Sequence, residues 1–179
     1  MRSARARLLL AAFGLWTLPW ARAQTDSASV ERLRAAFTLN FARYTSWPAS
    51  TPQRELRLCV AASTTQFEAF ADAEGRLIQG RPVRVLRLGR ERGAADCDLL
   101  YVGASHGTDA APLLRAAAEQ PTLTVGDAPG FLAQGGIIRL FAGDRQLRFD
   151  VGLAQANRAG LVLAPQLLRL ADRVETGSP

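Results

Sequence analysis

The sequence predicts an α/β fold in which a mostly parallel sheet is flanked by helices on both faces, with a C-terminal β-hairpin followed by helices. Two observations support this prediction. Short, near-continuous apolar runs, which are typical of buried parallel strands, alternate along the chain with helical patterns. Near the C-terminus, two strand patterns instead meet around Gly143-Asp144, which favours a hairpin.

The first expected helix spans residues 28–45 and carries a stripe of large apolar side chains at helical spacing. The stripe consists of Val30, Leu33, Phe37, Phe41 and Tyr44. Asn40 lies about 60° from this stripe around the helix. Trp47 and Pro48 follow the helix directly.

Four strands and two short helices are expected between this helix and the hairpin. The strands are residues 55–62, 82–88, 98–103 and 121–127. One helix follows Ser63, which is suited to be its N-cap. The other spans residues 107–119, with Pro112 in its first turn.

The hairpin is expected within residues 135–151. In its second strand, apolar residues face one way, while Arg148 and Asp150 face the other way, toward solvent. Two helical segments, residues 152–160 and 166–174, then close the chain. Arg148, Asp150 and the following Arg158 mark either a polar contact surface or simply a solvated face.

The N-terminus reads as a cleaved secretory signal peptide of residues 1–23. Three arginines precede a short apolar run, and the sequence Ala-Arg-Ala at 21–23 is a cleavage signal. The run is shorter than the roughly 20 residues that a membrane-spanning helix needs. Gln24 follows instead of cysteine, so no lipid anchor is expected. We therefore expect residues 24–179 to form one domain that works in the periplasm.

Cleavage would also change the charge of the protein. The full chain has a net charge of +6, from 22 basic and 16 acidic residues. Removing four arginines and no acid leaves 18 basic residues and a net charge of +2. The basic residues do not cluster as a nucleic-acid surface requires, so no nucleic-acid partner is expected.

Two cysteines, Cys59 and Cys97, remain after cleavage. In an oxidising compartment, a disulfide between them is the favoured interpretation, and two separately buried thiols are the alternative. Closing a loop of this length would stabilise the fold by roughly 3–4 kcal/mol.

The sequence contains no convincing active site, so we do not expect an enzyme. Its single histidine, His106, lies beside Ser105 in a loop after a strand, without a nucleophile motif. No phosphate loop or transition-metal cluster is present in the sequence, and no metal or cofactor is expected. Asp127 ends another strand, where it would either orient a ligand or form an Asx-turn. Ser105, His106 and Asp127 are therefore the candidates for a small-molecule site.

Several blocks of the chain together resemble the YfiR-like family of periplasmic proteins. The resemblance covers about residues 30–171, with the blocks in the same order. The blocks are FTLNFARYTSWP at 37–48, LCVAA at 58–62, CDLLYVG at 97–103, LTVGD at 123–127, GGIIRL at 135–140, LRFDV at 147–151 and AGLVLAPQLLRLA at 159–171.

This resemblance implies a negative regulator that binds the periplasmic part of an inner-membrane diguanylate cyclase, or of a sensor kinase, and so controls cyclic di-GMP and biofilm formation. An OmpA-like outer-membrane lipoprotein is implied as a second partner, and a homodimer is possible within the family. The resemblance also places a structural disulfide at Cys59 and Cys97. The main alternative is a periplasmic small-molecule sensor.

The resemblance further suggests roles for individual residues. It places the regulatory surface around Asp150, Leu153, Ala156 and Arg158, which we expect to touch a partner. The stripe of Phe37, Phe41 and Tyr44 is expected to pack on the sheet. Asn40 is expected to hydrogen-bond a neighbouring backbone group, and Trp47-Pro48 to fix the entry to the first strand.

Overall fold

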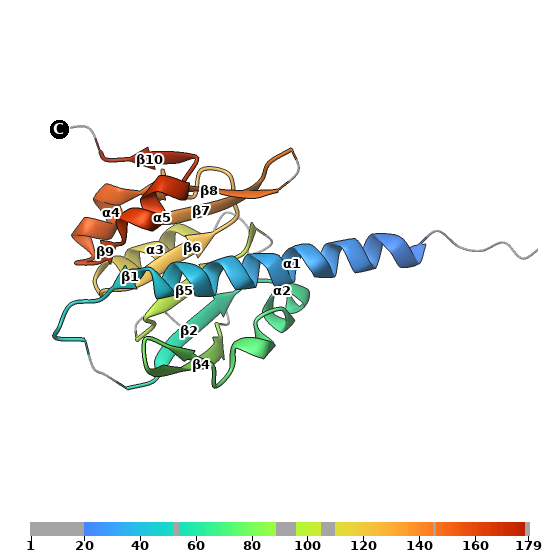
Figure 1. Ribbon diagram of the computed structural model, residues 1–179, viewed down its shortest axis with the longest axis horizontal. Coiled ribbons are helices and arrows are strands. Elements are labelled where there is room, and N and C mark those ends of the chain that lie inside the picture. Colours follow the sequence, from blue (N-terminus) through green and yellow to red (C-terminus); the bar gives the residue numbers. More distant parts are fainter. Residues whose placement is uncertain (1–19, 52–53, 89–95, 105–109, 145, 178–179) are drawn as a thin grey trace, which may run out of the picture.

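A computed structural model describes residues 20–51, 54–88, 96–104, 110–144 and 146–177 of the chain (Figure 1). The helices are α1 (Trp20–Arg43), α2 (Thr64–Glu68), the 3-10 helix η1 (Ala71–Ala73), α3 (Ala110–Ala118), α4 (Leu153–Arg158) and α5 (Pro165–Leu170). The strands are β1 (Thr45–Ser46), β2 (Leu56–Ala61), β3 (Leu77–Ile78), β4 (Arg81–Arg87), β5 (Leu99–Val102), β6 (Leu123–Gly126), β7 (Ile138–Ala142), β8 (Leu147–Gly152), β9 (Val162–Leu163) and β10 (Arg173–Glu175).

The central sheet has eight strands in the order β10-β8-β7-β6-β5-β2-β4-β3. The five strands from β7 to β4 run parallel, and β7 and β8 form the antiparallel hairpin that the sequence predicts. Three features were not predicted. The edge strand β10 pairs in parallel with β8, the other edge strand β3 pairs antiparallel with β4, and the short strands β1 and β9 form a separate two-stranded sheet.

Helices cover both faces of the sheet, which confirms the predicted fold class. Alternate residues of each buried strand point to opposite faces. In β5, Leu99 and Tyr101 enter one core with Phe41 of α1, while Leu100 and Val102 enter a second core with Leu114 of α3. The near-continuous apolar strands seen in the sequence follow directly from this burial on both sides.

Helix α1 packs on the sheet with only part of the predicted stripe: Phe41 is buried and Phe37 packs against the same core. Its buried residues are Ala35, Thr38, Leu39, Phe41 and Ala42. Val30, Leu33 and Tyr44 remain 41%, 45% and 48% exposed, so the expected packing of Tyr44 is wrong. The contact face is therefore turned toward Ala35, Leu39 and Ala42, with Phe37 at its margin.

Asn40 is likewise not a buried amide. It is exposed, and its side-chain oxygen accepts a hydrogen bond from Arg43 Nη1 at 3.0 Å. The buried polar residues of α1 are threonines instead. The Thr38 hydroxyl donates to the carbonyl oxygen of Arg34 at 2.8 Å, which satisfies it within the helix.

The expected signal peptide of residues 1–23 lies mostly outside the described residues, and its last four residues are the first four of α1, which begins at Trp20. Of the helices in the described ranges, none is both long and apolar enough to cross a membrane.

Candidate functional site

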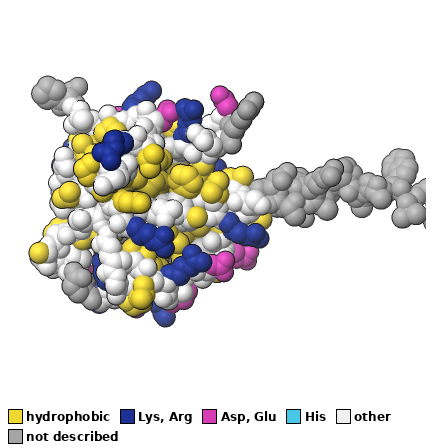
Figure 2. Space-filling view, in the orientation of Figure 1, with side chains coloured by type: hydrophobic (Ala, Val, Ile, Leu, Met, Phe, Trp, Pro, Cys, Tyr) yellow, Lys and Arg dark blue, Asp and Glu magenta, His cyan; other side chains and the backbone are white. Residues whose placement is uncertain are grey.

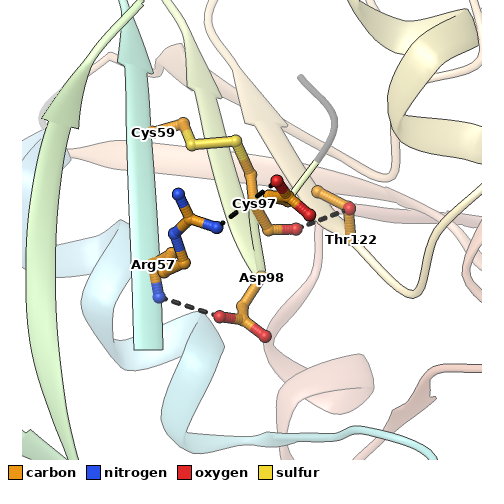
Figure 3. Close-up of a disulfide and its surroundings, with 6 residues drawn as sticks. Arg57, Cys59, Cys97, Asp98 and Thr122 are labelled. Carbon is orange, nitrogen blue, oxygen red and sulfur yellow. Dashed lines mark hydrogen bonds and ion pairs between the residues drawn. A yellow bond between two sulfur atoms is a disulfide. The ribbon is translucent and has the colours of Figure 1, made fainter. Parts of the chain in front are cut away.

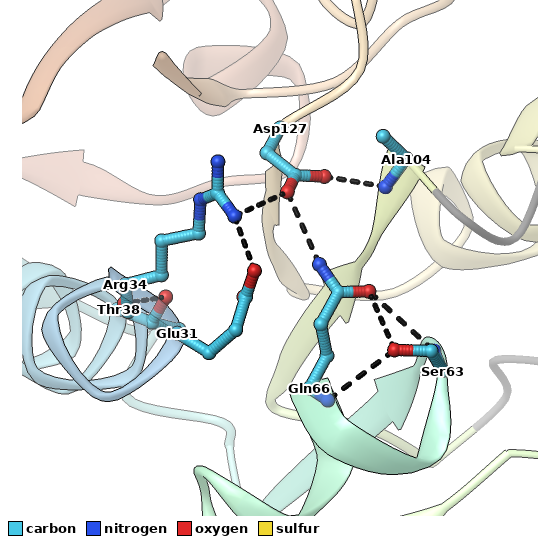
Figure 4. A network of polar contacts seen from close by, with 7 residues as sticks. All are labelled: Glu31, Arg34, Thr38, Ser63, Gln66, Ala104 and Asp127. Atoms are coloured by element: carbon cyan, nitrogen blue, oxygen red, sulfur yellow. Dashed lines mark hydrogen bonds and ion pairs between the residues drawn. The ribbon is translucent and has the colours of Figure 1, made fainter. Parts of the chain in front are cut away.

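A buried polar cluster lies where β5 and β6 end, beneath α1 (Figure 4). At its centre is Asp127, directly after β6, with a side chain that is only 3% exposed. One carboxylate oxygen accepts a hydrogen bond from Gln66 Nε2 at 3.2 Å and faces Arg34 Nη1 at 3.4 Å. The other accepts a hydrogen bond from the backbone N–H of Ala104. Both oxygens of Asp127 are therefore engaged by the protein itself.

Each member of the cluster comes from a different element. Arg34 reaches in from α1, where it also pairs with Glu31 at 2.5 Å, three residues earlier on the helix. Gln66 belongs to the first turn of α2, where it forms a capping box with Ser63, the N-cap that the sequence predicts. The cluster thus joins α1, α2 and the ends of two strands through charge-assisted hydrogen bonds.

Tyr101 of β5 lies fully buried beside this cluster, with its ring 4.9 Å from that of Phe70. Burial, and then the charge of Asp127, raise the pKa of the Tyr101 hydroxyl well above its usual range. The hydroxyl therefore stays protonated. The Tyr101 hydroxyl interacts with Asp127 without a hydrogen bond of ordinary geometry, and Arg34 Nε has no hydrogen-bond partner among the described residues.

These observations bear on the residues proposed for a small-molecule site. Ser105 and His106 lie outside the described residues. Asp127 is engaged within the protein by Ala104, Gln66 and Arg34. Within the described ranges, no group of three histidine, cysteine or acidic residues is placed to hold a metal ion.

The disulfide between Cys59 and Cys97 is present, and it joins the middle of β2 to the segment before β5 (Figure 3). Both cysteines are buried in the second core, on the side of α3. The carbonyl oxygen of Cys97 accepts a hydrogen bond from the Thr122 hydroxyl at 2.7 Å. The bond therefore fastens the centre of the sheet, with no free cysteine remaining.

A second polar cluster surrounds Asp98, the residue after the disulfide. Its carboxylate pairs with Arg81 at 2.9 Å and accepts a hydrogen bond from the backbone N–H of Arg57 at 2.8 Å. Its carbonyl oxygen accepts a hydrogen bond from the Trp47 indole at 3.3 Å. Trp47 thus links the chain after α1 to the start of β5, a partner that the sequence pattern did not reveal.

The expected partner-contact residues are not equally accessible. Leu153 is half-buried and Arg158 is exposed, both on α4. Ala156 is fully buried. Asp150 is only 6% exposed and pairs with Arg139 at 2.9 Å, so its predicted place on a wet face is wrong. The unpredicted strand β10 lies beside β8, with Arg173 opposite Asp150.

A cavity of about 160 Å³ lies next to α4, between it and α3. Its lining includes Arg115, Gln155 and Arg158 together with apolar side chains. Gln155 Nε2 donates to the carbonyl oxygen of Leu132 at 3.5 Å, while the buried Gln155 Oε1 has no hydrogen-bond partner in the described part of the chain. The arrangement offers shape and polarity for binding.

Comparison with known proteins gives one family and two solved folds. A family model described as YfiR/HmsC-like matches residues 31–172. The fold is similar to an ABC domain from Streptococcus pneumonia in complex with L-Trp, with a TM-score of 0.54, 10% identity, and coverage of 78% of this chain and 61% of that one. It is also similar to a conserved domain protein from Vibrio cholerae, with a TM-score of 0.55, 11% identity, and coverage of 81% and 60%.

At these identities, the two solved structures support the α/β fold alone. The chain also spans only about three fifths of the length of each. The family match supports more than the fold, because it extends over residues 31–172, which include more than half of α1 and nearly the whole sheet.

Proposed function

The chain belongs to the YfiR/HmsC-like family, and on this premise we propose that it is a periplasmic negative regulator of an inner-membrane signalling protein. Family membership supports a periplasmic regulator of cyclic di-GMP signalling in general, within a regulatory and non-catalytic family. The finer proposal is that the protein binds the periplasmic part of a diguanylate cyclase and holds it inactive, limiting cyclic di-GMP and biofilm formation.

The match over residues 31–172 is the observation that carries this proposal. The disulfide fits it, because such bonds persist in oxidising compartments. The proposal includes cleavage of residues 1–23, leaving residues 24–179 as the mature domain. The proposal also covers a sensor kinase in place of the cyclase. It further includes an OmpA-like lipoprotein that sequesters the protein, and a homodimer.

For the contact itself, we propose that α4 meets the partner through Leu153 and Arg158. Asp150 and Ala156 support this surface from behind, since both are buried. Asp150 holds the Arg139 guanidinium at 2.9 Å and thereby fixes the hairpin that precedes α4. A substitution at Arg158 therefore tests the contact, whereas one at Asp150 would also disturb the fold.

The decisive experiment measures cyclic di-GMP in cells with and without the gene. Deletion should raise cyclic di-GMP, and the exported protein should restore the original level. A version lacking residues 1–23 should not restore it, because the protein would remain in the cytoplasm. An unchanged level on deletion would remove the cyclase from the proposal.

A small-molecule sensor is the second candidate, and the cavity beside α4 is the observation that favours it. Arg115 and Arg158 could bind an anionic group there, with the unpartnered Gln155 Oε1 accepting a hydrogen bond. A ligand of this site should raise the melting temperature of the protein in a saturable way. The increase should disappear in an Arg115→Ala variant that is itself folded.

A further inference from the structure

The cavity between α3 and α4 is bordered by two arginines without a counter-charge. Arg115 and Arg158 stand in the last turns of these two helices, and both are exposed. Neither forms an ion pair with a carboxylate within the part of the chain that the structure describes. Their guanidinium groups are therefore available to an anionic ligand.

The absence of an acidic residue from the lining distinguishes this cavity from other arginine-lined grooves of the described chain. Three such grooves each include an aspartate, namely Asp72, Asp98 or Asp172. On the face of the molecule shown in Figure 2, basic side chains are scattered among hydrophobic and uncharged ones. The cavity beside α4 thus combines two cations at one enclosed place, which favours an anion there.

The cavity also includes a hydrogen-bond acceptor without a donor. Gln155 Oε1 is buried and has no hydrogen-bond partner among the described residues. The other end of the same amide is engaged, because Nε2 donates to the carbonyl oxygen of Leu132 at 3.5 Å. Gly152 lets the amide approach the backbone, since a Cβ at that position would lie 2.7 Å from Oε1. A ligand that brings an O–H or N–H group to this oxygen would satisfy it.

The rest of the lining is largely apolar and limits the size of a ligand. Leu114, Ala118, Ile137 and Ala159 contribute to it. The volume is about 160 Å³, and a protein cavity of about 150 Å³ accepts a benzene ring. A body of one ring would therefore fill the space. Inorganic phosphate would leave the apolar side chains without contact.

We propose that this cavity binds a small hydroxycarboxylic acid with one carboxylate, an apolar body the size of a ring, and a hydroxyl at the opposite end. The carboxylate pairs with Arg115 and Arg158, whose planar guanidinium groups match its geometry. The hydroxyl donates to Gln155 Oε1, and the body packs against Leu114 and Ile137. A free amino acid fits less well, because its ammonium group would lie beside its carboxylate and hence near both guanidinium groups.

Arg158 connects this ligand to the regulator. The same side chain is proposed to contact the signalling partner, so a carboxylate bound to it would remove a cation from that contact. Ligand and partner then bind antagonistically, and each weakens the affinity of the other by the same factor. This step rests on the proposed function, and it makes the ligand a signal that relieves repression.

Calorimetric titration of the exported protein with para-hydroxybenzoate tests the ligand class. This probe should bind in a saturable way. Benzoate lacks the hydroxyl and para-hydroxybenzyl alcohol lacks the carboxylate, so each should bind about tenfold more weakly. No saturable binding of para-hydroxybenzoate, or equal affinities for the three compounds, would overturn the proposal.

Two substitutions assign the groups of the probe to residues. Arg115→Gln should weaken the binding of para-hydroxybenzoate about tenfold, while Arg76→Gln, at an exposed position outside the cavity, should not change it. Gln155→Met removes the acceptor, so para-hydroxybenzoate should then bind no better than benzoate, whose affinity should stay the same. Unchanged affinity in Arg115→Gln, or an unchanged preference for the hydroxyl in Gln155→Met, would place the probe elsewhere and contradict the site.

Cyclic di-GMP in cells tests the antagonism. Added para-hydroxybenzoate should raise it in the wild type toward the level of the gene deletion. The rise should be lost in a strain with Arg115→Gln, which keeps Arg158 for the partner. An equal rise in both strains, or none in the wild type, would refute the antagonism.

The outcomes separate this inference from the proposed function. If deletion of the gene leaves cyclic di-GMP unchanged while the titrations give the expected pattern, the ligand site stands, and the antagonism is refuted with the cyclase on which it rests. If deletion raises cyclic di-GMP but para-hydroxybenzoate does not bind, the regulator stands and the ligand site is refuted.

Discussion

Arg81 and Asp98 form a buried ion pair across the start of β2, with 2.9 Å between Arg81 Nη2 and Asp98 Oδ1. The same guanidinium donates to the carbonyl oxygens of Arg54 and Glu55 at 2.9 and 3.0 Å. Both charges are therefore paired and hydrogen-bonded, as charges removed from water must be.

Breaking this pair should cost much of the stability. Asp98→Asn leaves Arg81 buried without a counter-charge, and we expect the free energy of unfolding to fall by about 3 kcal/mol. Urea denaturation measures the change. Arg84→Met breaks an exposed pair with Glu74 and should cost no more than about 1 kcal/mol. Equal losses in the two variants would contradict the buried character of the Arg81–Asp98 pair.

Reduction of the disulfide should also destabilise the protein. Cys59 and Cys97 are 38 residues apart, so cleavage of the bond should lower the free energy of unfolding by roughly 3–4 kcal/mol. A double Cys59→Ala, Cys97→Ala variant should have the same free energy of unfolding as the reduced protein, and added reductant should not change it. Thiol titration of the denatured, unreduced protein should find no free thiol; two reactive thiols would refute the bond.

Tyr101 gives the protein a specific response to alkali. Its folded pKa is raised from an ordinary value of 10.0, so above about pH 10 the unfolded chain loses a proton that the folded chain keeps. Ionisation then favours unfolding, and the free energy of unfolding of the wild type should fall relative to Tyr101→Phe. Urea denaturation at pH 7 and at pH 11 measures this difference, since arginine stays protonated at both.

The same variant tests the buried hydroxyl at neutral pH. Its interaction with Asp127 lacks the geometry of an ordinary hydrogen bond, so Tyr101→Phe should change stability by less than about 1 kcal/mol at pH 7. A larger loss would show that the hydroxyl has a partner in solution. Parallel pH profiles for the two proteins would contradict the raised pKa.

Arg158→Glu should separate repression from folding. Arg158 is exposed in the last turn of α4, so the variant should keep the wild-type melting temperature. Cyclic di-GMP should rise to the level of the gene deletion, because the proposed contact is lost. Arg76→Glu makes the same charge change at an exposed position before β3 and should still repress. Full repression by folded Arg158→Glu would remove α4 from the contact.

The sequence predicted the inner strands of the central sheet better than it predicted which face of α1 packs on that sheet. Continuous apolar runs identify β2, β5 and β6 because those strands are buried on both faces. The stripe through Phe37 was a wrong prediction of burial at its exposed members, because a hydrophobic pattern selects large apolar residues whether or not the fold buries them. The face that packs on the sheet combines large residues such as Phe41 with small ones such as Ala35 and Ala42, which a pattern of large apolar residues does not mark.

The polar clusters could not be predicted, because each joins residues far apart in the chain. Arg34, Gln66 and Asp127 meet only after α1, α2 and β6 have been placed. Asp150 was predicted to face solvent because apolar and polar residues alternate along β8, a pattern that is typical of a strand with one face exposed to solvent. Asp150 is instead buried beside its cross-strand partner Arg139, and the short, polar strand β10, which gives no apolar signal, pairs with the outer edge of β8.

The two edges of the sheet limit how this protein can associate with others. β3 has two residues and β10 has three, and the exposed Arg173 and Glu175 make the second edge charged. β3 pairs only with Arg81 and Pro82, and along the rest of β4 the exposed Arg84 and Arg87 and the Glu74 side chain, which accepts a hydrogen bond from the Val85 backbone N–H, occupy the edge instead. A strand added at either edge would have to displace charged side chains, which favours recognition through side chains, so specificity can change by substitution while the sheet stays intact.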